Sequence, residues 1–314
     1  MTFYLKTFLY LLGFLFSMKH TLKITLILIG LFFVSQVIGL AVTNAYIEHE
    51  KIEIGITEKA TFKELPMNLS RPEVEEKTSF VYILVAILIV TVLVLVLMKF
   101  GGIIFWKLWY FLAIWLCLGI ALAAFMNQIL ALIIGFLMAT YKVFRPAIIV
   151  QNLTEVLIYG GLAAIFVPIM NVFSAVLLLV FISIYDFVAV YKTRHMIKLA
   201  KFQSKLKIFA GLLIPYKIGR IKRKGRAKLV KVRTAILGGG DIGFPLIFAG
   251  VVMKGLMLNN PAWQAFLKTM IIPFFATLAL LYLLLKAEKK KFYPAMPFLT
   301  IGCLVGYFVV LAIA

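Results

Sequence analysis

The sequence predicts an all-α membrane protein, a polytopic bundle of nine transmembrane helices. Apolar residues make up 64% of the 314 residues, and the mean hydropathy is +1.06, whereas soluble domains are about 45–50% apolar. Several runs of about 20 residues carry little or no charge, which is the length that a helix needs to cross a bilayer. Because these runs lack the alternation of barrel strands, and a spanning backbone must satisfy its own hydrogen bonds, helices are the expected elements.

Apolar runs between charged residues or Pro and Gly breaks delimit the nine expected spans. They cover residues 22–46, 79–98, 103–125, 127–141, 147–167, 172–191, 235–256, 263–285 and 294–313. Residues 1–21 form an N-terminal lead-in whose apolar stretch is too short to span, and no small-residue cleavage site follows it. We expect this lead-in to lie in the cytosol or at the membrane surface. The whole chain, residues 1–314, is expected to form one membrane domain.

Charge placement predicts the orientation of the bundle. Residues 192–234 carry fifteen Lys and Arg side chains and no Asp or Glu, so the positive-inside rule makes this basic loop cytoplasmic. Residues 47–78 carry eight of the twelve acidic residues and are then an external loop. Counting spans outward gives a multi-pass protein of the cell membrane with a cytoplasmic N-terminus and an external C-terminus. The net charge of +21 lies beside apolar runs, which fits anionic lipid headgroups and not a nucleic-acid partner.

The residues that bind metals are few and lie apart. His20, His49 and His195 fall outside the expected spans, and the pattern His-Glu-x-x-His is absent. Cys117 and Cys303 lie inside apolar runs as packing residues. No metal and no cofactor are therefore expected.

The only two aspartates of the chain, Asp186 and Asp241, both lie within expected spans. An ionisable group inside a membrane helix costs at least about 2.5–3.5 kcal/mol, so such groups usually face a cavity and carry function. Asp186 precedes Lys192, which marks the end of its span, by six residues, and Asp241 follows the start of the next span by six, so the sequence predicts equal depths. Two carboxyls in contact at low dielectric hold one proton between them, which is the state that aspartyl proteolysis needs.

Three local patterns accompany the aspartates. Tyr185 directly precedes the first, and Gly238, Gly239 and Gly240 precede the second, where glycine permits a close backbone approach. At the start of the last span, Pro294 and Pro297 flank Ala295 and Met296. Because proline lacks an amide donor, we expect carbonyl groups to be left exposed there.

Together these motifs resemble the presenilin and signal peptide peptidase family of intramembrane aspartyl proteases, and in particular its archaeal presenilin homologues. The family's Tyr-Asp corresponds to Tyr185-Asp186, its Gly-x-Gly-Asp to 238–241, and its Pro-Ala-Leu to 294–296, with Met296 in place of leucine. The resemblance covers the chain from about residue 22 onward. It implies a presenilin-like fold and an aspartic endopeptidase of the GxGD type.

The resemblance also implies roles for residues and partners. Asp186 and Asp241 would be catalytic, Tyr185 and Gly238–Gly240 would support the site, and Pro294–Pro297 would bind substrate. The substrates would be transmembrane helices cut within the bilayer, favoured when their N-terminus is outside, with no obligate accessory subunit. In substrate-bound relatives the segment before the seventh span can form a strand, which makes Leu229, Val230 and Val232 strand candidates. Gly239 departs from the leucine often found in presenilins, which affects the expected choice of substrate.

Two other function classes remain open. The aspartate pair would also suit a proton- or ion-coupled transporter or channel, although that reading leaves the glycine and proline patterns unexplained. A catalytically inactive scaffold for membrane helices is the third reading, and the intact aspartate pair argues against it. Glu155, the other acidic residue within a span, is expected to hydrogen-bond to Asn, Thr or Lys side chains in the bundle.

Overall fold

The computed structural model describes residues 21–52, 58–100, 103–145, 147–192, 209–221, 229–288 and 293–313. Its helices, in chain order, are α2 (Leu22–Tyr46), η1 (His49–Lys51), η2 (Pro66–Asn68), α3 (Ser79–Phe100), α4 (Ile103–Ala123), α5 (Gln128–Phe144), α6 (Ile148–Phe166), α7 (Val172–Tyr191), α9 (Gly239–Leu256), α10 (Ala262–Thr269), α11 (Ile271–Lys286) and α12 (Met296–Ile313). Two strands, β1 (Gly211–Ile221) and β2 (Leu229–Gly238), lie between α7 and α9.

Within these ranges, eight helical segments are long and apolar enough to cross a membrane, with α10 and α11 together making one of them. The apolar helix α5 is shorter, at 17 residues. Counting α5, the predicted nine-helix membrane bundle is confirmed. The expected lead-in at residues 1–20 lies outside the described residues.

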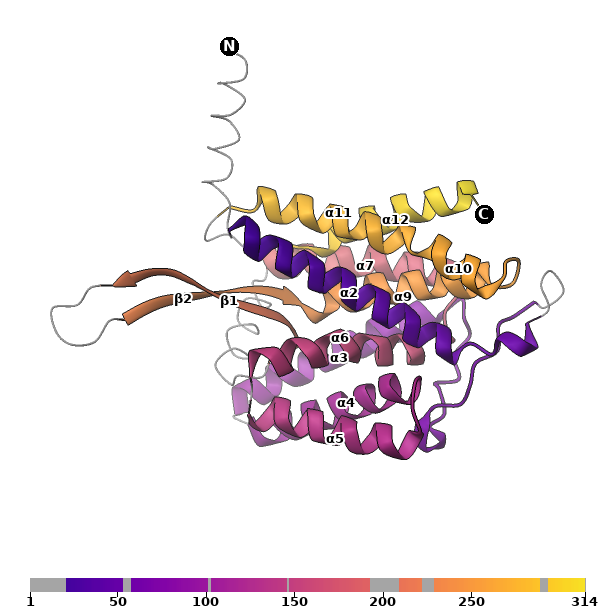
Figure 1. Ribbon diagram of the computed structural model, residues 1–314, viewed down its shortest axis with the longest axis horizontal. Coiled ribbons are helices and arrows are strands. Elements are labelled where there is room, and N and C mark those ends of the chain that lie inside the picture. The colour runs from indigo at the N-terminus through magenta and orange to yellow at the C-terminus, as the bar shows by residue number, and fades with distance from the viewer. Residues whose placement is uncertain are drawn as a thin grey trace, which may run out of the picture.

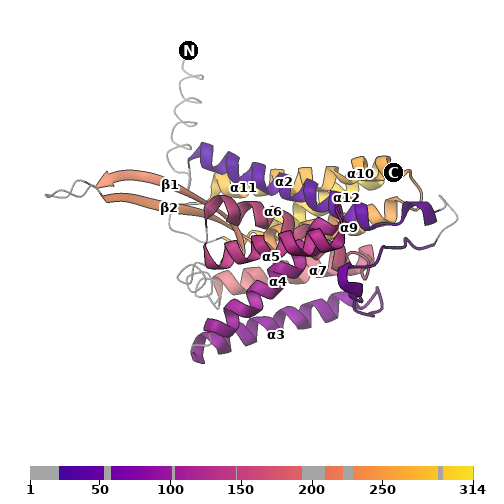
Figure 2. The ribbon, with the colours of Figure 1, turned by 60° about the horizontal axis from the view of Figure 1, so that its bottom comes forward.

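Helix α9 is the centre of the bundle and packs on α2, α6, α7, α11 and α12. Its side chains from Ile242 to Met253 are all buried except that of Phe244, which is partly buried. α4 and α5 pack on each other and against α6, while α3 lies at the edge on α7 and α4 (Figures 1 and 2). The helix that carries Asp241 is therefore fixed by neighbours on every side.

Strands β1 and β2 form an antiparallel hairpin that starts inside the bundle and extends past the helix ends (Figure 1). Its inner part is buried, with Leu212, Ala235 and Leu237 at most 4% exposed in the same core as α9. The strand expected around Leu229, Val230 and Val232 is thus confirmed and runs on to Gly238. The segment 192–234, expected to be a loop, contains most of this hairpin, although residues 193–208 and 222–228 lie outside the described part.

The start of the seventh helix differs from the prediction. The apolar run suggested residue 235, but residues 235–238 belong to β2, and α9 begins at Gly239. β-branched and aliphatic residues such as Ile236 favour a strand as readily as a helix, so hydropathy alone misplaced the boundary. Asp241 is consequently the third residue of its helix, whereas Asp186 lies five residues before the end of α7. The residue count behind the predicted equal depths therefore does not hold for Asp241, and the equal depths themselves stay a prediction.

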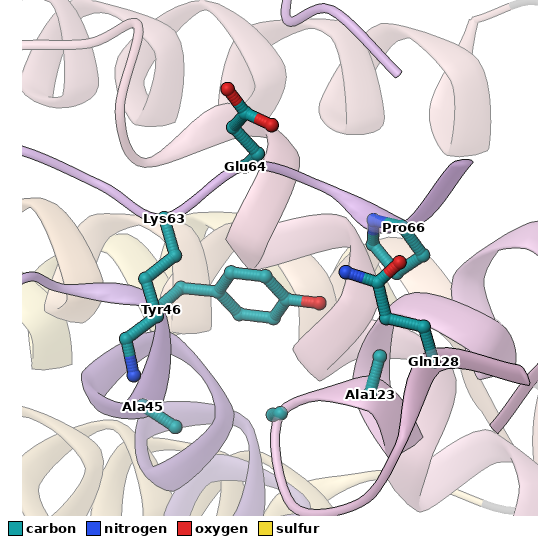
Figure 3. Close-up of a pocket in the computed structure, with 8 residues that line it drawn as sticks. Ala45, Tyr46, Lys63, Glu64, Pro66, Ala123 and Gln128 are labelled. Atoms are coloured by element: carbon teal, nitrogen blue, oxygen red, sulfur yellow. The ribbon is translucent and has the colours of Figure 1, made fainter. Parts of the chain in front are cut away.

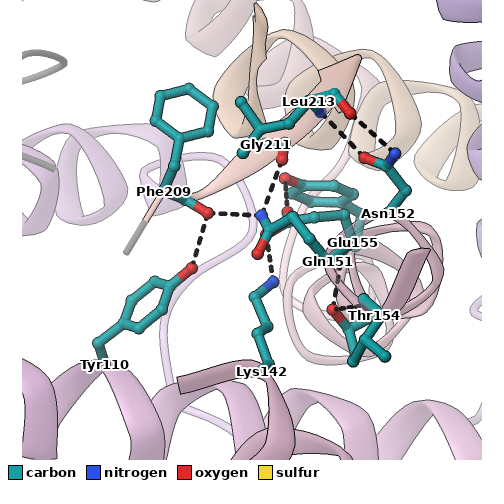
Figure 4. A network of polar contacts seen from close by, with 11 residues as sticks. Tyr110, Lys142, Gln151, Asn152, Thr154, Glu155, Phe209, Gly211 and Leu213 are labelled. Atoms are coloured by element: carbon teal, nitrogen blue, oxygen red, sulfur yellow. Dashed lines mark hydrogen bonds and ion pairs between the residues drawn. The ribbon is translucent and has the colours of Figure 1, made fainter. Parts of the chain in front are cut away.

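Side chains of α6 close the outer edge of β1 (Figure 4). Asn152 donates to the Leu213 carbonyl and accepts from the Leu213 amide, both at 2.9 Å. The amide nitrogen of Gln151 donates to the carbonyls of Phe209 (2.7 Å) and Gly211 (3.0 Å). A strand edge inside a membrane leaves polar backbone groups that must find partners, and these two side chains supply them.

A buried ion pair lies beneath this edge. Lys142 of α5 bonds to Glu155 of α6, and both side chains are at most 2% exposed. Glu155 also accepts hydrogen bonds from Gln151 at 3.1 Å and from Tyr159. The hydrogen bonding expected for Glu155 is therefore confirmed, with the buried Lys142 as its lysine partner.

The ion pair yields a stability prediction. Glu155→Gln leaves the Lys142 charge buried without its counter-charge, so we expect a loss of about 3–5 kcal/mol. Adding Lys142→Met to that variant should recover much of the loss, because it removes the orphaned charge. Unfolding in detergent by heat or by SDS measures both effects.

The exposed pair between Lys51 and Glu48, whose side chains are 64% and 23% exposed, is the matched control. Glu48→Gln should lower the stability far less, because solvent screens this pair. Equal losses for Glu155→Gln and Glu48→Gln would contradict the prediction.

Candidate active site

The two aspartates lie on neighbouring helices, at the end of the bundle from which the hairpin emerges. α7 and α9 pack against each other, and the carboxyl groups are close enough for their charges to repel. Asp186 is 3% exposed, while Asp241 is partly exposed. The structure therefore brings together the two residues that the sequence singled out.

The proline-flanked segment contacts Asp186 directly. The Met296 amide donates to Asp186 Oδ2 at 3.1 Å, and the Ala295 amide bonds to the same carboxylate. Helix α12 begins at Met296, so Asp186 accepts from the free amides that every helix N-terminus presents. Pro297, in the first turn, lacks an amide that would need such a partner.

This contact adds to the expectation for the last span. The carbonyl exposure that the sequence suggested stays a prediction, while the amides between the prolines face the aspartate and stabilise negative charge on it. Pro294 and Met296 are buried, and Ala295 and Pro297 are partly buried. A hydrogen bond between Ser183 and Thr300 (2.6 Å) holds α7 against α12 one turn from the contact.

The glycines form a narrow turn between β2 and Asp241. A Cβ atom on Gly238 would lie 3.2 Å from Asp241 Oδ2, and one on Gly239 would lie 2.6 Å from the Tyr159 hydroxyl. On Gly240 it would approach only Phe244, at 3.3 Å. Side chains thus approach the backbone closely at Gly238 and Gly239, while the close approach of another backbone stays a prediction.

The Tyr185 side chain reaches toward α3. Its hydroxyl is 3.4 Å from Thr91 Oγ1 of α3, so it faces α3, whereas Asp241 lies on α9. The role of Tyr185 as a supporting residue stays a prediction.

Two residues near the aspartates were missed by the sequence reasoning. Gln36 of α2 donates to the Ile242 carbonyl at 2.8 Å, directly after Asp241. Tyr159 packs on Gly239 and on Gly243, where a Cβ atom would lie 3.5 Å from its ring. Tyr159 and Glu155 are spaced i, i+4 on one helix face, a signal that was available.

A pocket elsewhere in the bundle does not belong to this site. It is lined by the end of α2, the start of α5 and the loop before α3, including Tyr46, Lys63, Glu64 and Gln128 (Figure 3). The pocket lies at the end of α2 and the start of α5, whereas the aspartates lie at the other end of the bundle, where α9 starts (Figure 1). Among the described residues, no group of three or more His, Cys, Asp or Glu side chains could hold a metal ion.

Comparisons with known proteins agree with this arrangement. Residues 29–314 match the family model described as signal-peptide peptidase, presenilin aspartyl protease. No curated protein matches the chain.

Two solved structures of a presenilin family intramembrane aspartate protease share the fold, each at 20% sequence identity. The one in space group C222 has a TM-score of 0.62 and covers 92% of this chain and 99% of its own. The one in space group P2 has a TM-score of 0.57, with 93% and 98% covered. With a family match across most of its length and a multi-pass membrane fold, this chain belongs to the signal peptide peptidase and presenilin family of intramembrane aspartyl proteases.

Proposed function

We propose that this protein is a GxGD-type endopeptidase that hydrolyses peptide bonds within transmembrane helices, with Asp186 and Asp241 as its catalytic pair. The main support is the convergence of three segments: Asp186 on α7, the glycine turn before Asp241, and the Ala295–Met296 amides. Family membership supports the reaction class. The comparisons give no support to the transporter alternative.

The number of backbone donors suggests different starting roles for the two carboxyls. Asp186 accepts from two amides, those of Ala295 and Met296, at the start of α12. Asp241 accepts from one amide, that of Gly238. Because two carboxyls this close in a low-dielectric interior share one proton, the carboxylate with more donors carries the charge and the other carries the proton. We assign Asp186 as the initial general base and Asp241 as the initial general acid.

Hydrolysis follows from these roles. Asp186 takes a proton from water as the water oxygen bonds to the peptide carbonyl carbon, and Asp241 gives its proton to the carbonyl oxygen. The C–N bond of the tetrahedral intermediate then breaks as Asp186 passes its proton to the leaving nitrogen. Asp241 regains a proton from the hydroxyl that becomes the new carbonyl, which restores the starting state.

Among the described residues, the outer edge of β2 has no strand partner, which leaves it open to an extended substrate. The β1 edge is closed by Gln151 and Asn152, and Pro215 on the same edge has no amide to donate. Because Leu213 pairs with Ile236 and turns its polar groups away from β2, Ile236 turns its own away from β1. We propose that the substrate adds as a strand to this outer edge of β2, which leads through Gly238 toward Asp241.

The basic segment 192–234 and the acidic segment 47–78 support an orientation with the aspartates near the cytoplasmic face. Glu58→Cys should react with a membrane-impermeant thiol reagent in intact cells, and Lys192→Cys only after permeabilisation; both native positions are exposed. The native Cys117 and Cys303 are buried and serve as the unreactive background. The reverse labelling pattern would invert the proposed orientation.

The catalytic assignment predicts that Asp186→Asn and Asp241→Asn each abolish cleavage of a transmembrane-helix peptide by the purified protein in lipid. The isosteric change removes the carboxylate and keeps the shape, so the melting temperature should change far less than the activity. A transition-state-mimicking hydroxyl inhibitor should block the unmodified protein, and a chelator should not. Undiminished cleavage by either variant would overturn the assignment.

The edge assignment predicts a binding defect for Ile236→Pro. Proline removes the outward amide of β2, so we expect KM to rise about tenfold through the loss of one substrate hydrogen bond. Ile236→Val changes the side chain and keeps the amide, which makes it the matched control. Equal KM values for the two variants, measured with the same peptide, would argue against strand addition at this edge.

A further inference from the structure

Tyr159 lies buried against the turn that leads into Asp241. Its side chain is 4% exposed, and its hydroxyl occupies the space that a side chain at Gly239 would need. A Cβ atom there would lie 2.6 Å from Tyr159 Oη, 3.2 Å from Cε1 and 3.3 Å from Cζ. The first of these distances is a clash, while the other two are tight contacts.

The tyrosine cannot easily turn aside, because Glu155 fixes its hydroxyl. Glu155 accepts from Tyr159 with one carboxylate oxygen and from Lys142 and Gln151 with the other. Moving the hydroxyl away would leave a buried carboxylate oxygen without its donor, which is costly in a low-dielectric interior. Lys142 and Gln151 are themselves buried, at 2% and 5% exposed.

Gly239 is the middle residue of the Gly-x-Gly-Asp motif, so the contact bears on the backbone that carries Asp241. On one side Tyr159 presses against this turn, and on the other the Gly239 amide donates to the Ala210 carbonyl at 3.1 Å. The turn is thus held between α6 and the start of the hairpin. A shift of about 1 Å in a catalytic group is enough to cost about 100-fold in rate.

We propose that Tyr159, oriented by Glu155, is a positioning residue that sets the turn before Asp241 and restricts position 239 to glycine. This inference rests on the proposed catalytic role of Asp241. It gives the reason why this chain carries glycine at the variable position of the motif: the tyrosine hydroxyl fills the space of the missing side chain. Residues 159 and 239 are then coupled, and enlarging one requires trimming the other.

The test is rescue in a peptide-cleavage assay with the full-length protein in lipid. Gly239→Ala should lower kcat by about 10- to 100-fold, because the methyl group and the tyrosine hydroxyl displace the turn. Tyr159→Phe removes only the clashing oxygen and keeps the ring. The double variant Gly239→Ala/Tyr159→Phe should therefore recover at least about tenfold of the lost kcat, a coupling typical of residues in contact.

Gly240→Ala is the matched control, since a Cβ atom at that position meets Phe244 of its own helix and not Tyr159. Tyr159→Phe should bring no recovery to Gly240→Ala. KM should stay near its original value in the Gly239 variants, because the change acts on the position of Asp241 and not on the β2 edge. A general loss of folding would instead lower kcat for both glycine variants without selective rescue.

The outcomes separate the inference from the function on which it rests. No recovery by Tyr159→Phe, or equal recovery of Gly239→Ala and Gly240→Ala, overturns the inference. If Gly239→Ala unfolds, its melting temperature and its binding of a hydroxyl transition-state inhibitor replace kcat, and failure of Tyr159→Phe to restore them overturns it equally. Cleavage that survives Asp186→Asn or Asp241→Asn would instead refute the proposed function.

Discussion

The structure depends on how the backbone of β1 is satisfied inside a helical membrane bundle. A helix bonds its own amides and carbonyls, but a two-stranded hairpin exposes polar groups along both outer edges. Here Asn152 pairs with Leu213 as a neighbouring strand would, and Gln151 takes the carbonyls of Phe209 and Gly211. With the β1 edge closed by side chains, the hairpin remains anchored beside α9, and the outer edge of β2 has no strand partner among the described residues.

The closed edge and the glycine turn are linked through one buried network. Gln151, which bonds β1, also bonds Glu155, which in turn holds Lys142 and Tyr159. A buried ion pair of this type adds little net stability compared with apolar packing, since desolvation offsets most of its attraction. It contributes defined directions instead, because Glu155 accepts hydrogen bonds from three separate side chains. The same few side chains thereby fix where β1 starts and where α9 begins.

The sequence was sufficient to predict the helical bundle and the residues that come together in it. It was not sufficient to predict their local geometry. Hydropathy located the spans, and the cost of burying a carboxylate singled out Asp186 and Asp241. Hydropathy placed the start of the seventh helix wrongly at residue 235, because a short aliphatic run fits a strand as well as a helix. Lys142 illustrates a related limit: a lysine at a span end usually faces the headgroups, and only the fold reveals that Glu155 of the next helix neutralises it.

Tyr159 shows why the remaining part of the site could not be predicted from the sequence. A tyrosine in an apolar run can have many roles. Nothing in the order of residues shows that it touches a turn 80 positions further along the chain. The i, i+4 spacing from Glu155 indicated a shared helix face, but not what that face contacts. The glycine at 239, in contrast, was conspicuous without being explained. A glycine in a motif can be explained only by the atoms that surround it. Here Tyr159, held by Glu155, occupies the space next to Gly239.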